Sequence, residues 1–385
     1  MSAEIQENTP RIEQKSSGEN TPRIGPTSSG EHRIDLSTIL KVATEKNATD
    51  IHLQAGLPPI LRIQKKLVAL GTEKLSPERV EELMFPIMND HQKVLFKQSM
   101  EYDFSYGVKG LARFRINVFR QRETMAAALR KIPYDIPGMD TLGLPPATFT
   151  FPKLNRGFVL VTGPTGHGKS TTLASVLDRI NQERQMHIIT LEDPIEYLFQ
   201  HRQSIVVQRE LGTDTQSFAN ALRSALREDP DVILVGEMRD FETIGAALTA
   251  AETGHLVFAT LHTNSAAQTI DRIVDVFPPY QQQQVKVQLA NTLSAVMTQQ
   301  LMVRKNGDGL VLACEVMLAT PAIKNLIREG KTYQIQSVLQ TNTAMGMMTM
   351  DQSLKALYER GVISYEDAID HAFDPKELQR LLGRA

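Results

Sequence analysis

The sequence predicts an α/β protein in which a small N-terminal α/β domain precedes a larger domain with a phosphate-binding loop and a helical C-terminal part. Three observations indicate this fold class. The motif G-x-x-x-x-G-K-[ST] occupies residues 163–170. The apolar run at residues 158–161 before it has the length and β-branched content of a buried parallel strand. Residues 171–177 after it have the spacing of an amphipathic helix, which completes the strand-loop-helix context that the motif requires.

The composition limits the classes of protein that this chain can be. At 385 residues it is long enough for roughly two or three domains. A formal net charge of -2 argues against a nucleic-acid-binding surface built on overall basicity. The single cysteine, Cys314, excludes an intrachain disulfide and a cysteine-rich zinc site. Because the N-terminus is polar and no apolar run could span a bilayer, we expect a cytoplasmic protein without a membrane span or a nucleic-acid partner.

The N-terminal tail, residues 1–33, differs in composition from the rest of the chain. Residues 7–12 recur as residues 19–24, and Ser, Gly, Pro and charged residues dominate. Such a segment has almost nothing to bury, so we expect it to be disordered.

Three further segments follow this tail. Residues 34–132 read as the small α/β domain, which begins with a helix that Asp35 can cap. Residues 133–152 are rich in Pro and Gly and are predicted to form a linker. Residues 153–385 are predicted to form the domain with the phosphate loop and the C-terminal helices.

The phosphate loop supplies the predicted nucleotide-binding residues. Its glycines let successive N–H groups face the phosphates, Lys169 reaches the β- and γ-phosphates, and Ser170 can ligate Mg²⁺. A glycine-rich turn that binds nothing would need neither the lysine nor the hydroxyl. We expect the His167 side chain to face solvent, with a role in phosphate binding as the alternative. The predicted binding residues are Gly163, Pro164, Thr165, Gly166, His167, Gly168, Lys169, Ser170 and Thr171.

Acidic residues follow two further predicted strands of the same domain. Glu192 and Asp193 come after the apolar run at residues 187–191, and Glu237 comes just after the run at residues 232–235. Ligands bind beyond the carboxyl ends of parallel strands, so these acids should meet the nucleotide. We assign Glu237 to the attacking water, Glu192 to catalysis and Asp193 to the metal, although Glu192 and Asp193 could exchange roles.

Two histidines flank the next buried strand, within residues 254–264. His262 lies at the carboxyl end of this strand, which favours a role as a sensor of the γ-phosphate. His255 lies at its start and is expected to pack or cap.

One strand of the small domain carries a row of arginines. Within residues 112–120, Phe114, Ile116 and Val118 should face the core, whereas Arg113 and Arg115 share the opposite face. Such a face is often only solvated, but a planar guanidinium is also what an anion site recruits.

The phosphate loop, the acidic box at residues 191–197, the run at residues 231–240 and the histidine box at residues 254–264 together resemble the type II/IV secretion ATPase superfamily. Within it, the chain is most similar to the PilT family of type IV pilus retraction ATPases, from about Thr38 onward.

This resemblance implies a PAS-like N-terminal domain, a RecA-like ATPase domain, and ATP and Mg²⁺ as ligands. It further implies a homohexamer at the cytoplasmic face of the inner membrane, where the platform protein of the pilus machine is its partner and retraction drives twitching motility. ATP would lie between the RecA-like domain of one subunit and the N-terminal domain of its neighbour. Arg115 and Arg130 match the nucleotide-contacting pair of the family, and Arg113 is a weaker candidate.

Four alternative functions are compatible with the same motifs. An accessory retraction ATPase shares all four boxes. A pilus assembly or secretion ATPase usually carries a larger N-terminal region and a four-cysteine zinc insert, against which the single cysteine argues. A nucleotide-gated scaffold would bind ATP without turnover, and the intact Lys169, Ser170 and Glu237 weigh against it. A nucleic-acid translocase would be stimulated by DNA, which we do not expect.

Overall fold

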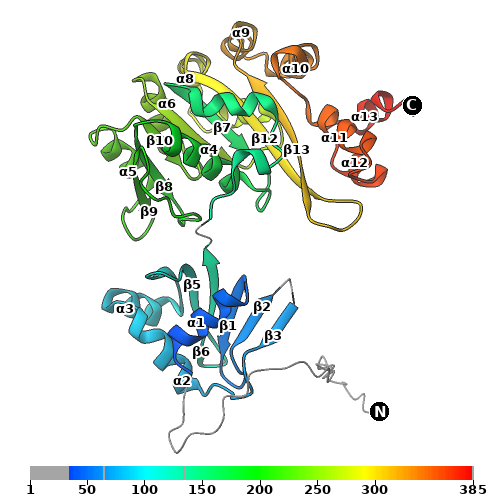
Figure 1. Ribbon diagram of the computed structural model, residues 1–385. Coiled ribbons are helices and arrows are strands. Elements are labelled where there is room, and N and C mark those ends of the chain that lie inside the picture. The colour runs from blue at the N-terminus through cyan, green and yellow to red at the C-terminus, as the bar shows by residue number, and fades with distance from the viewer. Residues whose placement is uncertain (1–33, 64–65, 133–134, 384–385) are drawn as a thin grey trace, which may run out of the picture.

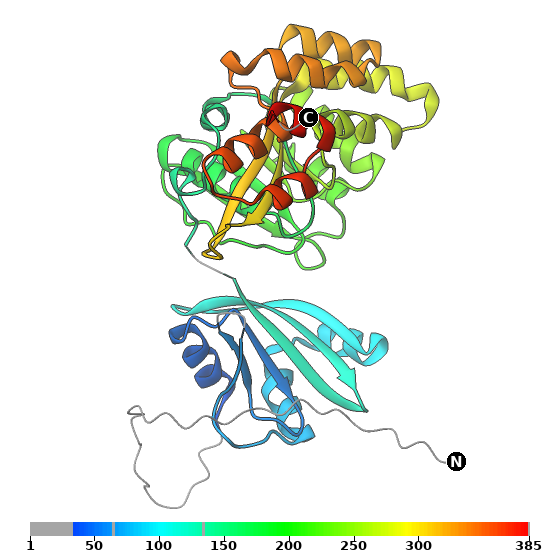
Figure 2. The same ribbon diagram turned by 90° about the vertical axis from the view of Figure 1, so that its right-hand side faces the viewer.

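The computed structural model describes residues 34–63, 66–132 and 135–383. The predicted disordered tail, residues 1–33, lies outside these residues. Two separate β-sheets organise the chain, a small one in the N-terminal part and a larger one in the C-terminal part (Figure 1). The last strand of the small sheet along the chain, Thr124–Ile132, points toward the larger sheet (Figure 2). This two-part α/β architecture agrees with the predicted fold class.

The N-terminal part is an antiparallel sheet with helices packed on one face. Its strand order is β3-β2-β1-β6-β5-β4. Its helices are α1 (Leu36–Glu45), α2 (Pro77–Met84) and α3 (Asp90–Ser99), with a 3₁₀ turn η1 (Phe85–Ile87). Its strands are β1 (Asp50–Gln54), β2 (Ile60–Ile63), β3 (Lys66–Ala69), β4 (Glu101–Val108), β5 (Ala112–Gln121) and β6 (Thr124–Ile132).

Strand β5 has the alternation that the sequence predicts. Phe114, Ile116 and Val118 are fully buried in the small core together with apolar residues of the three helices. Successive side chains of a strand point to opposite faces, so Arg113 and Arg115 lie on the face away from this core. That face is turned toward the larger domain (Figure 2). The predicted cap of α1 is also confirmed, because the Asp35 carboxylate accepts a hydrogen bond from the backbone N–H of Thr38.

The larger sheet has the order β13-β12-β7-β11-β10-β8-β9, with parallel pairing except between β12 and β13. Its strands are β7 (Gly157–Thr162), β8 (His187–Glu192), β9 (Ile205–Glu210), β10 (Val232–Val235), β11 (Leu256–Leu261), β12 (Leu293–Val303) and β13 (Leu310–Leu318). Its helices are α4 (Lys169–Glu183), α5 (Phe218–Ala225), α6 (Phe241–Glu252), α7 (Ala266–Asp275), α8 (Pro279–Thr292), α9 (Pro321–Glu329), α10 (Ile335–Thr341), α11 (Met350–Glu359), α12 (Tyr365–Asp370) and α13 (Pro375–Leu381).

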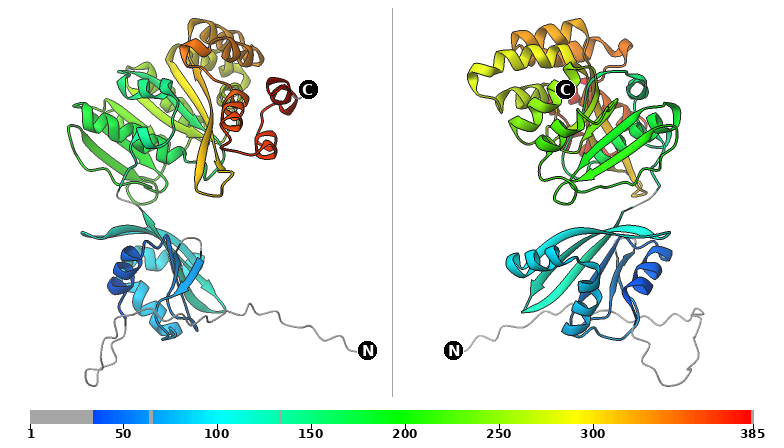
Figure 3. Two further views of the ribbon diagram at one scale, coloured as in Figure 1. Left: turned by 45° about the vertical axis from the view of Figure 1, so that its right-hand side comes forward. Right: turned by 90° about the vertical axis from the view of Figure 1, so that its left-hand side faces the viewer.

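Helices cover both faces of this sheet, which explains why its central strands are continuously apolar. In β7, Phe158 and Leu160 pack with residues of α5 to α8, whereas Val159 and Val161 pack with α4 on the other face. Helices α11 to α13 lie beside β13 at the sheet edge (Figure 3). Among the described helices, none combines the length and the hydropathy that a membrane span needs.

Part of the predicted linker packs onto the larger domain. The 3₁₀ segments η2 (Met139–Thr141) and η3 (Pro146–Lys153) cover α4, and Phe151 is buried in that core. Two further 3₁₀ turns, η4 (Thr332–Gln334) and η5 (Thr343–Met345), connect C-terminal helices. The boundaries between the four segments stay a prediction.

A buried carboxylate lies between β13 and the helix that follows the histidine box. Glu315 is 1% exposed, and its Oε1 accepts a hydrogen bond of 2.7 Å from the backbone N–H of Ala266 at the start of α7. Among the described residues, its buried Oε2 has no hydrogen-bond partner. Burial raises the pKa of Glu315 to about 7, well above the ordinary 4.5.

We therefore expect Glu315 to make stability pH-dependent. Because the folded-state pKa of Glu315 is higher than the unfolded one, the contribution of Glu315 to stability is most favourable below pH 4.5 and declines until about pH 7. This difference corresponds to at most about 3 kcal/mol. In thermal unfolding, the midpoint of Glu315→Gln should fall less over this interval than that of the wild type. Glu359→Gln, at an exposed position of α11, is the control, and equal falls in all three proteins would contradict the prediction.

Candidate active site

The phosphate loop joins β7 to α4 and depends on glycines at two places. Gly163 lies so close to β12 that a Cβ there would stand 2.2 Å from the carbonyl oxygen of Gln299. Gly168 caps α4 with a φ of 79°, a left-handed conformation that other residues adopt only with strain. The loop thereby curls tightly, and the first N–H groups of α4 point at a site suited to anions.

The loop lysine is buried at the start of α4. Its Nζ donates hydrogen bonds to the carbonyl oxygens of Gly163 at 2.8 Å and Pro164 at 3.0 Å. Burial lowers the pKa of Lys169, while the carboxylates of Glu237 and Glu196 raise it. The ammonium is thus positioned on the loop that the phosphates would occupy.

A cleft of about 630 Å³ opens beside this loop. Because β7, β8, β10 and β11 are parallel, their carboxyl ends meet at the same edge of the sheet and bring the motifs together. The predicted residues that line the cleft are Arg115, Thr165, Gly166, Gly168, Lys169, Ser170, Thr171, Glu192, Asp193, Glu237 and His262.

Glu237 and His262 form a direct pair across β10 and β11. Oε1 of Glu237 lies 3.0 Å from Nε2 of His262, and Arg239 donates a hydrogen bond of 2.6 Å to Oε2. The other ring nitrogen of His262 lies 3.4 Å from the hydroxyl of Thr165 in the phosphate loop. The hydrogen bond from Arg239 is the main cause that lowers the pKa of Glu237, so this carboxylate is ionised and oriented.

Glu192 has a different environment. It is 9% exposed and accepts hydrogen bonds from Thr190 at 2.6 Å, from Gln208 at 3.1 Å and from the backbone N–H of Glu196 at 3.4 Å. Burial raises the pKa of Glu192, against these hydrogen bonds. Three donors therefore surround the Glu192 carboxylate and tie it to the loop that follows β8.

The cleft contains oxygen donors that suit Mg²⁺. Ser170 and Asp193 both line it, and Asp193 is exposed. The described residues contain no cluster of three His, Cys, Asp or Glu side chains that could hold a metal alone. This sparse set fits Mg²⁺, which keeps several waters and binds through one or two protein groups and the phosphates of its nucleotide.

His167 is partly buried and does not line the cleft, and its ring has a hydrogen-bond partner that we did not expect. Its Nδ1 accepts a hydrogen bond of 2.9 Å from the backbone N–H of Leu301 in β12, and its carbonyl oxygen accepts one of 2.6 Å from Gln299. Burial, followed by the charges of Lys169 and His371, lowers the pKa of His167, so the neutral ring is favoured. This side chain anchors the back of the phosphate loop to β12.

The two arginines of the small sheet have separate surroundings. Arg115 lines the cleft of its own chain, and its expected role in the site of a neighbouring subunit stays a prediction. Arg130 is its cross-strand partner on β6 but does not line the cleft. Instead, Nε of Arg130 donates a hydrogen bond of 2.8 Å to the Asp50 carboxylate.

Three residues that hold the site together were not predicted from the sequence. Arg239 lies two residues after Glu237, a spacing that could have indicated its contact with that carboxylate. The Tyr197 hydroxyl lies 2.9 Å from the Thr171 hydroxyl and joins the acidic box to α4. Glu210 connects the acidic box to the small domain, and no local signal marks it, because its partners are distant in sequence.

Comparisons with known proteins agree with this fold. The family model described as "Type II/IV secretion system protein" matches residues 149–368. The protein of Pseudomonas aeruginosa named "Type IV pilus retractation ATPase PilT" is 49% identical over 343 residues, which cover 89% of this chain and 99% of the relative. The "Type IV pilus ATPase PilU" of the same organism is 39% identical over 349 residues, which cover 91% of each chain.

A solved structure extends the likeness to three dimensions. The structure described as "Crystal Structure of the Pilus Retraction Motor PilT and Bound ADP" has a TM-score of 0.85 and 50% identity, and it covers 90% of this chain and 100% of its own. Fold, cleft and family model together define a nucleotide-binding ATPase of the secretion type. The chain belongs to the PilT family of type IV pilus retraction ATPases.

The contacts of His167 predict the effect of removing its ring. His167→Ala should lower stability by about 1 kcal/mol, because the N–H of Leu301 loses its acceptor. The KM for ATP should stay within about threefold of the wild-type value, because the ring does not line the cleft. His201→Ala is the matched control, since Nδ1 of His201 accepts a similar bond from the backbone N–H of Val206 far from the loop. Thermal unfolding and steady-state phosphate release measure both quantities. A raised KM in His167→Ala alone would place the ring on the nucleotide.

Proposed function

We propose that this chain hydrolyses ATP to ADP and phosphate in the cleft between its two domains. The observation that carries the proposal is the convergence on one cleft of a phosphate loop, a buried lysine and the Glu237–His262 pair. Lys169 and the N–H groups of the loop would bind the β- and γ-phosphates. Arg115 would neutralise charge that develops on the γ-phosphate, from the opposite side of the cleft.

Glu237 would orient the attacking water. The water oxygen forms a bond to the γ-phosphorus, and the bond from that phosphorus to the β,γ-bridging oxygen breaks, which leaves ADP and phosphate. An ionised carboxylate accepts a hydrogen bond from the water and aligns it. Because Arg239 lowers the pKa of Glu237, this residue acts by orientation more than as a strong base. His262, paired with Glu237 and near Thr165, would report on the γ-phosphate.

Ser170 and Asp193, which both line the cleft, would hold Mg²⁺. When bound, the ion would neutralise negative charge on the phosphates. Glu192, which three donors surround, would then fix the shape of the acidic loop.

As a member of the PilT family, the chain is a pilus retraction motor. We propose that it works as a cytoplasmic homohexamer at the inner-membrane platform protein of the pilus machine. Hydrolysis in the cleft would rotate the two domains against each other, because residues of both domains line it. Identity is 49% to the relative named for pilus retraction and 39% to PilU, whose name does not mention retraction, which favours the retraction motor.

The role of Glu237 gives a direct test of hydrolysis. Glu237→Gln keeps the shape of the side chain but removes the charge that aligns water, so kcat for phosphate release should fall about a hundredfold or more. The KM for ATP should change little. Glu242→Gln, at an exposed position in the first turn of α6, should behave as the wild type. Wild-type turnover in Glu237→Gln would exclude this mechanism and revive the nucleotide-gated scaffold.

The cellular role has its own test. Cells that lack this protein should carry excess surface pili and fail to twitch, because pili would still assemble but not retract. Wild-type protein should restore motility, and Glu237→Gln should not. Pilus counts by electron microscopy and twitching zones measure the two effects. Loss of pili would indicate an assembly ATPase, and an unchanged phenotype would indicate an accessory role.

A further inference from the structure

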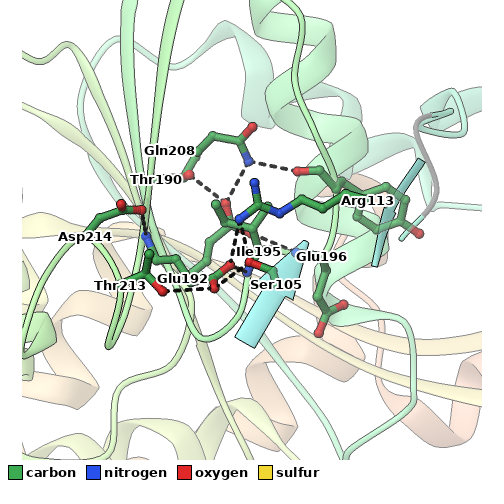
Figure 4. A network of polar contacts seen from close by, with 11 residues as sticks. Ser105, Arg113, Thr190, Glu192, Ile195, Glu196, Gln208, Thr213 and Asp214 are labelled. Carbon is green, nitrogen blue, oxygen red and sulfur yellow. Dashed lines mark hydrogen bonds and ion pairs between the residues drawn. The ribbon is translucent and has the colours of Figure 1, made fainter. Parts of the chain in front are cut away.

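Three side chains join the two domains, and Figure 4 labels two of them, Ser105 and Arg113. Ser105 of β4 donates a hydrogen bond of 2.9 Å to Oε1 of Glu210, at the end of β9. Arg113 of β5 donates one of 2.6 Å to the Ser105 hydroxyl, and its Nη2 lies 3.5 Å from Oε2 of Glu210. We call these three residues the interdomain clasp.

Glu210 also holds the acidic loop. Its side chain is 5% exposed, and Oε2 accepts a hydrogen bond of 3.2 Å from the backbone N–H of Ile195. Two residues earlier on β9, Gln208 donates to the Glu192 carboxylate and to the carbonyl oxygen of Tyr197. One strand thus fixes the loop that carries Glu192 and Asp193, and the clasp connects that strand to the small domain.

Two residues of the clasp, Ser105 and Arg113, are neighbours of Arg115 in the small sheet. Ser105 is the cross-strand partner of Arg115, and Arg113 precedes it by two residues on the same face of β5. The side chain of Arg115 itself has a weak hold, because its ion pair with Asp103 is 3.8 Å long and both partners are about half exposed. The position of Arg115 in the cleft therefore depends on how the clasp places β5 relative to the larger domain.

We propose that Ser105, Arg113 and Glu210 are positioning residues for hydrolysis. They hold β5 against the larger domain so that Arg115 reaches the nucleotide of its own subunit, and they link that placement to the acidic loop. The proposal rests on the hydrolysis proposed above. Without Arg113, the buried Glu210 carboxylate would lose its nearby cation, and the two domains would lose their tie at this point.

A double-mutant cycle tests this role. Arg113→Ala and Arg115→Ala should each lower kcat/KM for ATP about tenfold, because a small misplacement of a positioned group is costly. If Arg113 acts through Arg115, the kcat/KM of the double variant should lie within about twofold of that of the less active single variant. Arg113→Lys should recover part of the loss, because it keeps the charge facing Glu210.

Controls separate positioning from folding. Arg120→Ala removes an arginine of the same strand whose ion pair, with Glu81 at 3.8 Å, stays within the small domain, so kcat/KM should not change. Ser105→Ala is a milder variant and should lower kcat/KM about threefold, with a thermal midpoint close to that of the wild type. Wild-type activity in both Arg113→Ala and Ser105→Ala, or losses that multiply in the double variant, would overturn the clasp. A wild-type protein that releases no phosphate would overturn the proposed function instead.

Discussion

The site depends on the parallel pairing of β7, β8, β10 and β11. Parallel strands end at one edge, so the phosphate loop, the acidic box, Glu237 and His262 meet there although they lie far apart along the chain. The close approach of β12 adds a second constraint, because it leaves room only for glycine at position 163. The same strand anchors His167, so the loop is supported from the side opposite the cleft.

Two glutamates at this edge have opposite environments, which separates their roles. Glu237 lies between Arg239 and His262, and the hydrogen bond from Arg239 lowers its pKa. Glu192 is buried among three hydrogen-bond donors, and burial raises its pKa. The ionised Glu237 carboxylate beside the cleft is suited to orienting a water molecule. The buried Glu192 carboxylate, with its hydrogen-bond donors, is suited to supporting the loop that follows β8.

The small domain contributes to the site through the face of its sheet that lies away from the core of that domain. The arginines on that face meet the larger domain at Glu210 and reach the cleft through Arg115. A motor that turns hydrolysis into domain rotation needs such a connection, since a nucleotide that contacts both domains can act on their relative position.

The sequence alone determined the phosphate loop, the acids at strand ends and the alternation of β5, because these follow from local motifs and from the periods of strands and helices. It could not place residues whose partners are distant. Tertiary structure set Arg130 against Asp50, turned His167 toward β12 and brought Glu210 to Arg113, across 97 positions of the chain. It also placed Arg115 in the cleft of its own chain. Spacing along a strand fixes the face on which a side chain lies, but only the packing of one sheet against another decides what that face meets.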